Sequence, residues 1–426
     1  MLAADGGVIG PAPARGRACP AVRAGLIAAW PLAVLLAAPL IARAATDAGR
    51  IERVLAQTPL IDGHNDLPWE IRARFGGDLA KIDLAASTAA LPAPPDGVPL
   101  MTDIARLRAG RVGAQFWSVW IPVDIKGAQA VQTTLEQIDL VKALCARYPA
   151  DLAMAYTAAD IVRVQGAPHR RVDTDWADSA TDTPAHHGLT PFGREVVREM
   201  NRLGMLVDLA HVSADTMRAA LTVTEAPVIF SHSSARALVD HPRDVPDDVL
   251  QLVAKNDGVV MVNFAPGYVS EARRRWDADR AAEKARDNSP PFGGLYIGQP
   301  ERIAAAVKAW EQAHPKPQAT IGDVADHIEH IRKVAGVDHV GIGSDFDGIP
   351  EAPVGLEGVD KFPALLEELG RRGWGDAELA KVAGANLLRV LRQAEGVSAR
   401  LRAARPPSLA TLAALDGTAA APPAHN

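Results

Sequence analysis

Six apolar runs of strand length, each bounded by turn residues, alternate with amphipathic helical patterns along this chain of 426 residues. The alternation predicts a parallel β-sheet covered by helices, because parallel strands need a long crossover between them. At this length the leading interpretation is a (β/α)8 barrel of the TIM type. A doubly wound open sheet comes second, since no GxGxxG turn follows an early run. The runs cover residues 58–63, 113–122, 204–211, 226–232, 258–265 and 338–348, and the helical patterns cover 130–148, 191–204, 213–224, 247–256, 324–336 and 376–393.

The number of strands falls short of a closed barrel. Eight strands are needed, six runs are convincing, and LAMAY at 152–156 is a weak seventh. The shortfall lies between the second and third runs, where residues 165–190 contain no apolar run. We therefore expect the barrel to be incomplete in this part of the chain.

The N-terminal segment is predicted to be a secretory signal peptide over residues 1–44. Three arginines precede the apolar run 25–42, which ends in the small-x-small pattern Ala42-Arg43-Ala44. The run is about as long as a minimal membrane span, so an uncleaved N-terminal anchor is the alternative. The expected location is therefore periplasmic or secreted, with membrane attachment only through this segment.

The rest of the chain is expected to form one barrel domain over residues 45–400. A charged helix, the segment NSPPFGG and a second helix interrupt the strand–helix rhythm at about 266–320. This stretch is interpreted as an insertion that serves as a lid or an assembly surface. Residues 401–426 are rich in alanine and proline and are expected to be a loose tail.

Charge and cysteine content exclude several classes of function. The formal net charge is -6 and no dense stripe of lysine and arginine is present, so nucleic acid is not expected as a partner. Only Cys145 remains after removal of the signal segment. The mature chain can therefore form neither an intrachain disulfide nor a cysteine-type zinc site.

Side chains that bind metals follow four of the six runs. In a barrel of this kind the C-terminal ends of the strands meet at one face, where the catalytic groups lie. Residues two apart on a strand share a face, as the first two in this set would. A single histidine at such a place is usually structural, but three histidines and several aspartates at the same end predict a metal site. The set is His64 and Asp66, then Asp208 and His211, then His232, then Asp345 and Asp347.

The predicted chemistry is hydrolysis. Imidazoles and carboxylates hold zinc and leave a position open for water, which then attacks a carbonyl or phosphoryl centre. A further aspartate can carry a proton to the leaving group. Arg243 is placed to meet a carboxylate bidentately, with a plain surface arginine as the alternative. Trp69 could wall a small pocket or simply pack, and the HIEH sequence at 327–330 is interpreted as a solvated helix face.

These residues belong to stretches that resemble the membrane dipeptidases, also called renal-type dipeptidases. The stretches are DGHNDLPW, RVGAQFWSVW, TLEQIDLV, GLTPFGREVVREMNRLGMLVDLAHVS, APVIFSHSSARAL, RDVPDDVL, VVMVNF, VADHIEHIRKVAGVDHVGIGSDFDG and ANLLRVL, in order over most of residues 58–393. The resemblance implies a (β/α)8 barrel with two zinc ions that hydrolyses dipeptides, usually as a homodimer. The insertion at 266–320 is similar to that of bacterial members.

The resemblance also assigns roles to individual residues. His64 and Asp66 match the zinc ligands after the first strand, and His211 and His232 match ligands of the second zinc. Arg243 matches the arginine that receives the terminal carboxylate of the substrate. Asp345 matches the catalytic aspartate after the last strand. No metal role is implied for Asp208.

The chain departs from the family pattern in one region. The family has a strand that ends in GVEGG, whose glutamate bridges the zincs, and another that ends in LTH, whose histidine binds substrate. Neither motif is present, so the third and fourth barrel strands are predicted to be missing. The predicted function is zinc-dependent hydrolysis of dipeptides. The alternatives are a non-catalytic descendant that binds a metal or peptide, and a hydrolase of another small amide.

Overall fold

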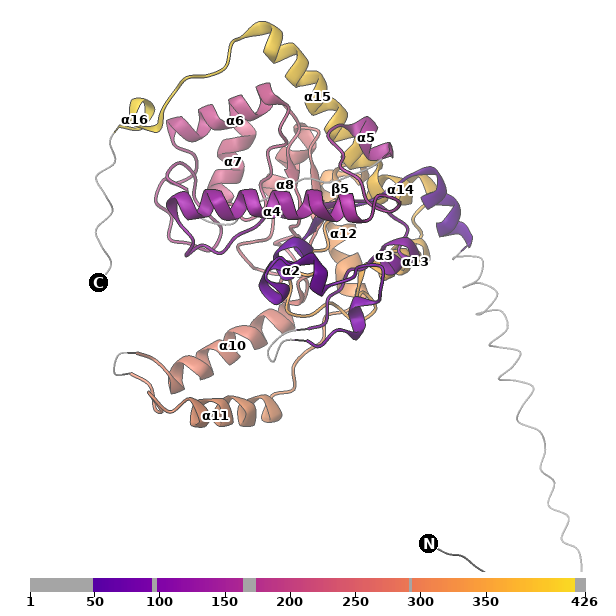
Figure 1. Ribbon diagram of the computed structural model, residues 1–426. Coiled ribbons are helices and arrows are strands. Elements are labelled where there is room, and N and C mark those ends of the chain that lie inside the picture. Colours follow the sequence, from indigo (N-terminus) through magenta and orange to yellow (C-terminus); the bar gives the residue numbers. More distant parts are fainter. Residues whose placement is uncertain (1–48, 94–97, 164–173, 291–292, 418–426) are drawn as a thin grey trace, which may run out of the picture. The chain divides into compact units, whose positions relative to one another are not determined.

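The structure, a computed structural model, describes residues 49–93, 98–163, 174–290 and 293–417. A parallel sheet of five strands lies among helices, with the strand order β2-β1-β5-β4-β3 (Figure 1). The predicted signal peptide lies outside the described residues. Within the described ranges, no helix has the length and hydropathy to span a membrane. The strands are β1 (Leu60–Asn65), β2 (Val112–Trp117), β3 (Ile229–Phe230), β4 (Val259–Val262) and β5 (Val340–Ile342).

Helices connect and cover the strands. Their sequence shows ordinary stop and start signals, such as the threonine that caps the amino end of α12 and the left-handed glycine that ends α6. The helices are α2 (Leu67–Phe75), α3 (Ile104–Ala109), α4 (Gly127–Arg147), α5 (Ala158–Arg163), α6 (Pro191–Leu203), α7 (Ala214–Val223), α8 (Asp247–Lys255), α9 (Pro266–Val269), α10 (Glu271–Asp287), α11 (Pro300–Ala313), α12 (Ile321–Ala335), α13 (Phe362–Arg371), α14 (Asp376–Ala380), α15 (Asn386–Ala404) and α16 (Leu412–Leu415). Short 3-10 turns lie at Leu79–Lys81, Thr88–Ala90, Val337–His339 and Val359–Lys361, and a π-helical turn at Lys381–Ala385 joins α14 to α15.

All six predicted runs contribute extended chain to the sheet. Five of them contain the labelled strands, and the sixth continues the sheet beyond β3. There Leu209 donates its backbone N–H to the carbonyl of Ile229 at 2.8 Å, and Ile229 donates to Val207 at 3.0 Å. The prediction of a strand at 152–156 is wrong: these residues have no regular structure. Alanine and methionine, which make up most of this run, have low strand propensity.

The sheet forms a half-barrel. In the part of the chain that the structure describes, no strand pairs with the outer side of β2 or continues beyond residues 207–209. A closed eight-stranded barrel is therefore not formed by these residues, and the fold-class prediction is corrected to a parallel half-barrel. A cavity of about 290 Å³ lies next to β2, lined by residues of β2, α3, α4 and the segment 149–153.

Neighbouring residues of each strand pack on opposite faces of the sheet, as a period of two requires. Val260 and Val262 of β4 lie in the large core that includes α8 and α12. Met261 lies in a second cluster, with Leu387 and Leu388 of α15. The turn into α15 therefore covers the inner face of the half-barrel.

Two glycines allow the sheet to curve tightly. β1 and β3 are not neighbours in the sheet, yet the carbonyl of Ser231, just after β3, reaches both Gly63 in β1 and Gly343 after β5. A Cβ on Gly63 would lie 2.3 Å from this oxygen, and one on Gly343 would lie 1.9 Å from it. Only glycine permits this approach.

Replacement of Gly343 by alanine is expected to lower the free energy of unfolding by about 3 kcal/mol. The obstructing atom is a backbone oxygen, which cannot move aside as the end of a side chain can. Urea unfolding followed by circular dichroism measures the loss. The control is Gly396→Ala in α15, where an added Cβ meets nothing within 4 Å and should be neutral or stabilise by up to about 1 kcal/mol. Equal stability of both variants would contradict the close contact.

The predicted insertion contains α9, α10 and α11. Figure 1 shows α10 and α11 side by side as a hairpin that extends away from the helices around the sheet. Trp276 of α10 packs on Trp310 of α11 with ring centroids 5.6 Å apart. Arg273, which is buried at the base of α10, binds Asp277 and Glu351. The hairpin thus has its own apolar seam and a buried ionic attachment to the main body.

Candidate metal centre

The end of β1 provides the first two side chains of the site. His64 is the fifth residue of β1 and Asp66 follows the strand directly. Nε2 of His64 lies 3.2 Å from Oδ2 of Asp66, and both side chains are almost wholly buried. Below them on the same strand, Asp62 accepts hydrogen bonds from Gln115 and Ser344. Burial raises the pKa of Asp62 to about 6, against the lowering effect of these bonds.

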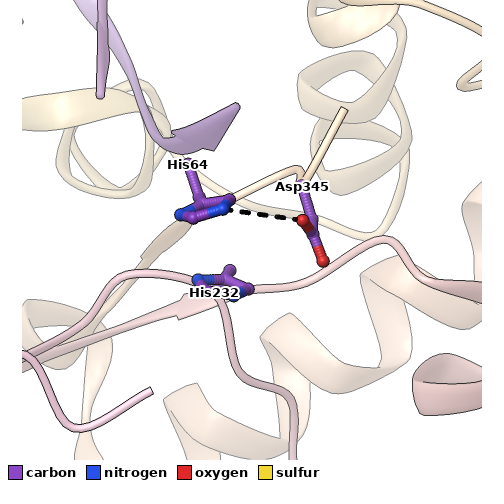
Figure 2. Close-up of side chains that lie close together, drawn as sticks. All are labelled: His64, His232 and Asp345. Atoms are coloured by element: carbon purple, nitrogen blue, oxygen red, sulfur yellow. Dashed lines mark ion pairs between the residues drawn. The ribbon is translucent and has the colours of Figure 1, made fainter. Parts of the chain in front are cut away.

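Two further histidines approach this pair from the other end of the sheet. His232 follows β3, and its ring stacks on that of His64 with centroids 3.8 Å apart (Figure 2). Nε2 of His211 lies 2.8 Å from Nε2 of His232. The hydroxyl of Ser231 lies 2.8 Å from Nδ1 of His232, which fixes the ring with Nε2 toward His211. Three strand ends thus deliver their imidazoles to one place.

Asp345 enters the cluster from the end of β5. Its Oδ1 lies 3.7 Å from Nε2 of His64, the contact drawn as a dashed line in Figure 2. Its Oδ2 accepts a hydrogen bond of 3.0 Å from the side-chain amide of Asn263, which follows β4. One candidate ligand atom each from His64, His232 and Asp345 lies within 4.8 Å of the others.

The backbone is strained at the same place. His211, Asp345 and Asp347 have φ values of 71°, 62° and 61°, in a region that non-glycine residues seldom adopt. Strain of this kind persists where the surrounding structure holds a functional side chain in position. Here it turns the side chains of His211 and Asp345 toward the cluster at the point where the chain leaves each strand.

The donor set fits a divalent metal ion. It combines buried imidazoles and carboxylates, which are the nitrogen and oxygen ligands of catalytic zinc sites. Gly348 leaves room for the carboxylates: a Cβ there would lie 2.0 Å from Oδ2 of Asp66 and 2.6 Å from Oδ1 of Asp345. The two carboxylates therefore converge on a spot that only glycine leaves open.

Arg243 lies beside the cluster and is buried, so its interpretation as a plain surface arginine is wrong. Its guanidinium donates to the carbonyl of His232 at 3.1 Å and to the hydroxyl of Ser233 at 3.4 Å. The guanidinium carbon lies 5.6 Å from the centre of the Tyr268 ring. A fixed positive charge therefore stands next to a candidate metal ligand.

Comparison with known proteins identifies the family. A profile described as "Membrane dipeptidase (Peptidase family M19)" matches residues 48–172 and 162–405. The chain belongs to the membrane dipeptidase family. The two matched segments meet at residues 162–172, between α5 and α6.

Relatives with sequence similarity bear the same description. The chain is 37% identical over 390 residues to an uncharacterized dipeptidase of Schizosaccharomyces pombe, with 80% of this chain and 82% of the relative covered. It is 36% identical over 375 residues to dipeptidase 3 of Rattus norvegicus, with 80% of this chain and 66% of the relative covered. The family and these relatives are dipeptidases, which are hydrolases.

Solved structures support the fold. A probable dipeptidase, PvdM, from Pseudomonas aeruginosa superposes with a TM-score of 0.66 at 22% identity, over 83% of this chain and 99% of that one. A metallo peptidase from Rhodobacter sphaeroides, liganded with a phosphinate mimic of the dipeptide L-Ala-D-Ala, gives 0.58 at 19% identity, over 79% and 99%. At these identities the match shows that this membrane dipeptidase shares their α/β architecture.

Three other residues singled out in the sequence lie near the centre without joining it through the contacts described. Asp208 accepts backbone hydrogen bonds from Ala210 and Ser231 through one oxygen, so it shapes the turns before both histidines. Asp347 accepts from the backbone of Met101 at 2.6 Å, and burial raises its pKa to about 6. Trp69 lies on the first turn of α2 and packs edge-on against Trp120.

His327 was missed by the sequence interpretation, which placed the HIEH sequence on a solvated helix face. Its side chain is buried, and Nδ1 accepts a hydrogen bond of 2.9 Å from the backbone N–H of Ala235. A signal was present, because Val324 and Ile331 lie three residues before and four residues after it on the same apolar face of α12. The polarity of histidine concealed this position.

Proposed function

We propose that this membrane dipeptidase hydrolyses dipeptides with zinc held by the cluster at the strand ends. One observation carries the proposal: His64, Asp66, His211, His232 and Asp345 come from three ends of the sheet and from β1, yet meet in a single buried group. Packing alone does not explain such a group, because buried carboxylates and imidazoles are costly without charge compensation.

Two pairs of residues would hold the metal. His64 and Asp66 would bind one zinc, and His211 with His232 would bind the second. Zinc, when bound, would supply a reactive water at neutral pH and polarise the scissile carbonyl. The hydroxyl of Ser231 would orient His232 in the manner of outer-shell partners of metal-binding histidines.

Asp345 is proposed to move the proton. Asn263 holds one carboxylate oxygen, so the other is turned toward His64 and the proposed metal site. From there Asp345 can accept a proton from the attacking water and deliver it to the leaving amine. This role needs a carboxylate that can take up a proton, which a metal ligand of the same geometry would not.

Arg243 is proposed to bind the terminal carboxylate of the substrate. The buried guanidinium, anchored to the backbone of His232, lies at the side of the metal cluster where a short peptide would end. Recognition of a free carboxylate beside the scissile bond limits the substrate to dipeptides. Trp69 is proposed as part of the wall of the substrate pocket.

The membrane dipeptidase barrel is proposed to lack its third and fourth strands here, with the bridging glutamate and the substrate-binding histidine that they carry in the family. The break in the family match at 162–172 and the unpaired side of β2 support this. Without the shared carboxylate, the second zinc should bind more weakly than the first, because less charge is neutralised. This feature favours a second candidate function, a non-catalytic descendant that binds a metal or peptide.

Dipeptide hydrolysis by the purified chain from residue 45, with added zinc and with chelator, tests the proposal. Zinc-dependent turnover that chelator abolishes is expected. A folded protein that binds zinc and does not cleave a dipeptide panel, but retains a dipeptide, would support the non-catalytic alternative. Cleavage of acylated amino acids or β-lactams in preference to dipeptides would identify a hydrolase of another small amide.

Arg243→Lys is expected to raise KM for a dipeptide by about 10- to 100-fold with little change in metal content. Lysine keeps the charge but loses the fork of donors that matches a carboxylate and the carbonyl of His232. Kinetics of the variant, with metal analysis, measures both effects. The control is Arg236→Lys, a partly exposed arginine in the same segment that pairs with Asp240. Equal loss of metal and of substrate affinity would contradict the assigned role.

The cellular context remains a proposal of the same kind. We propose that the protein is exported to the periplasm or secreted, and that it acts as a homodimer. Fractionation of cells that express the full chain tests the first statement, and light scattering of the purified protein tests the second.

A further inference from the structure

The residues 232–245, called here the 232–245 loop, carry both His232 and Arg243. The guanidinium of Arg243 returns to the carbonyl of His232, so the two ends of the loop are in contact. In between, the backbones of Ala235 and Val245 pair as a bridge, with Val245 donating to Ser234 at 2.8 Å and Arg236 donating to Val245 at 3.0 Å. The loop is therefore a small closed unit in which movement of Ala235 affects both functional residues.

His327 holds this unit from a different part of the chain. It lies on α12, 92 residues after Ala235, and its Nδ1 accepts the backbone N–H of Ala235 at 2.9 Å. Both residues are buried, Ala235 completely. Water therefore has no access to replace the hydrogen bond, and an unpaired buried N–H is unfavourable.

The chemistry of this imidazole suits a permanent support. A backbone N–H can only donate, so Nδ1 carries the lone pair and the ring proton lies on Nε2. Burial lowers the pKa of His327 to about 4, and the backbone of Val269 opposes this to a smaller extent. The ring stays neutral over the working pH range, and its acceptor is always available.

We propose that His327 is a positioning residue of the active site: its Nδ1 fixes the 232–245 loop, and through it the places of Arg243 and His232. The assignment to catalysis rests on the proposed function, whereas the support of the loop does not. Asn263 and Ser231 orient side chains within the centre directly, but His327 acts on the backbone three residues after His232 and, across the bridge, two residues after Arg243.

Two amide variants separate support from mere packing. In His327→Asn the side-chain oxygen can occupy the place of Nδ1, whereas in His327→Gln it reaches toward the place of Nε2. Both are neutral and polar. Hydrogen exchange of the 232–245 peptide, measured by mass spectrometry on the purified protein, should rise about tenfold in His327→Gln and stay near wild type in His327→Asn. His327→Leu, which lacks an acceptor, serves as a second test if the glutamine variant does not fold.

Kinetics connects the loop to the reaction. His327→Gln should raise KM for a dipeptide about tenfold with unchanged zinc content, and His327→Asn should restore most of the affinity. His330→Gln, on the same helix and paired with Asp247, is the control without effect on either readout. Equal behaviour of the asparagine and glutamine variants in exchange and in KM would overturn the proposal. If the wild type hydrolyses no dipeptide while exchange still follows the acceptor, the proposed function fails and the support of the loop stands.

Discussion

Replacement of His232 by alanine should remove zinc from the second site and reduce dipeptide hydrolysis by more than about 100-fold, the upper end for loss of an outer-shell partner of a metal ligand. His232 contacts the rest of the centre on three sides: it stacks on His64, lies 2.8 Å from His211, and is held by Ser231. Its loss leaves His211 without the neighbour that faces it. Metal analysis after dialysis, together with kcat and KM, measures the result.

The control for this variant is His330→Ala, which removes a histidine from α12 outside the cluster. It should retain the metal content and turnover of the wild type. Near-ultraviolet circular dichroism shows whether each variant keeps its tertiary packing. A folded His232→Ala variant with wild-type zinc content would remove His232 from the proposed ligand set.

Replacement of Asp345 by asparagine should lower kcat by about 10²- to 10⁴-fold and leave the zinc content unchanged. Asparagine has nearly the same shape and can still contact Asn263, but its amide cannot carry a proton. KM should change little, since Arg243 rather than Asp345 is assigned to the substrate carboxylate. Single-turnover kinetics with measured metal occupancy tests this directly.

The same experiment distinguishes two roles that the geometry leaves close together. Asp345 lies near enough to His64 and His232 to act as a ligand itself. Loss of zinc together with kcat in Asp345→Asn would assign it to the metal rather than to proton transfer. The matched control is Asp360→Asn, a half-buried aspartate that pairs with Lys361 and lies outside the cluster.

Much of the sheet could be predicted, because its strands are buried on both faces and appear as continuous apolar runs bounded by glycine and proline. The run 204–211 illustrates the limit: only residues 207–209 pair with β3, since the sheet has no partner on their other side. The segment 152–156 misled for the opposite reason. Its apolar residues pack without pairing, and Ala155 lies in a core cluster although the backbone is irregular.

The strand-end residues were predictable because a parallel sheet brings the same end of every strand together, whatever the connections are. What the sequence concealed are polar residues that support the backbone. Asp62 lies two residues before His64 on the same face of β1 and binds Ser344 across the sheet. His327 fills a position of the apolar face of α12. Both have partners distant in sequence, which local patterns do not reveal.

The pairing of β1 with β5 has a consequence for the biogenesis of the protein. These central strands meet at Asp62 and Ile342, so the middle of the sheet joins the beginning of the described chain to a point near its end. During synthesis, β1 cannot find its inner neighbour until Ile342 has left the ribosome. Contacts so distant in sequence form slowly. The nascent chain should therefore stay unfolded long enough to pass through a translocation channel as an extended thread, and chaperones that bind exposed apolar segments would be needed until release.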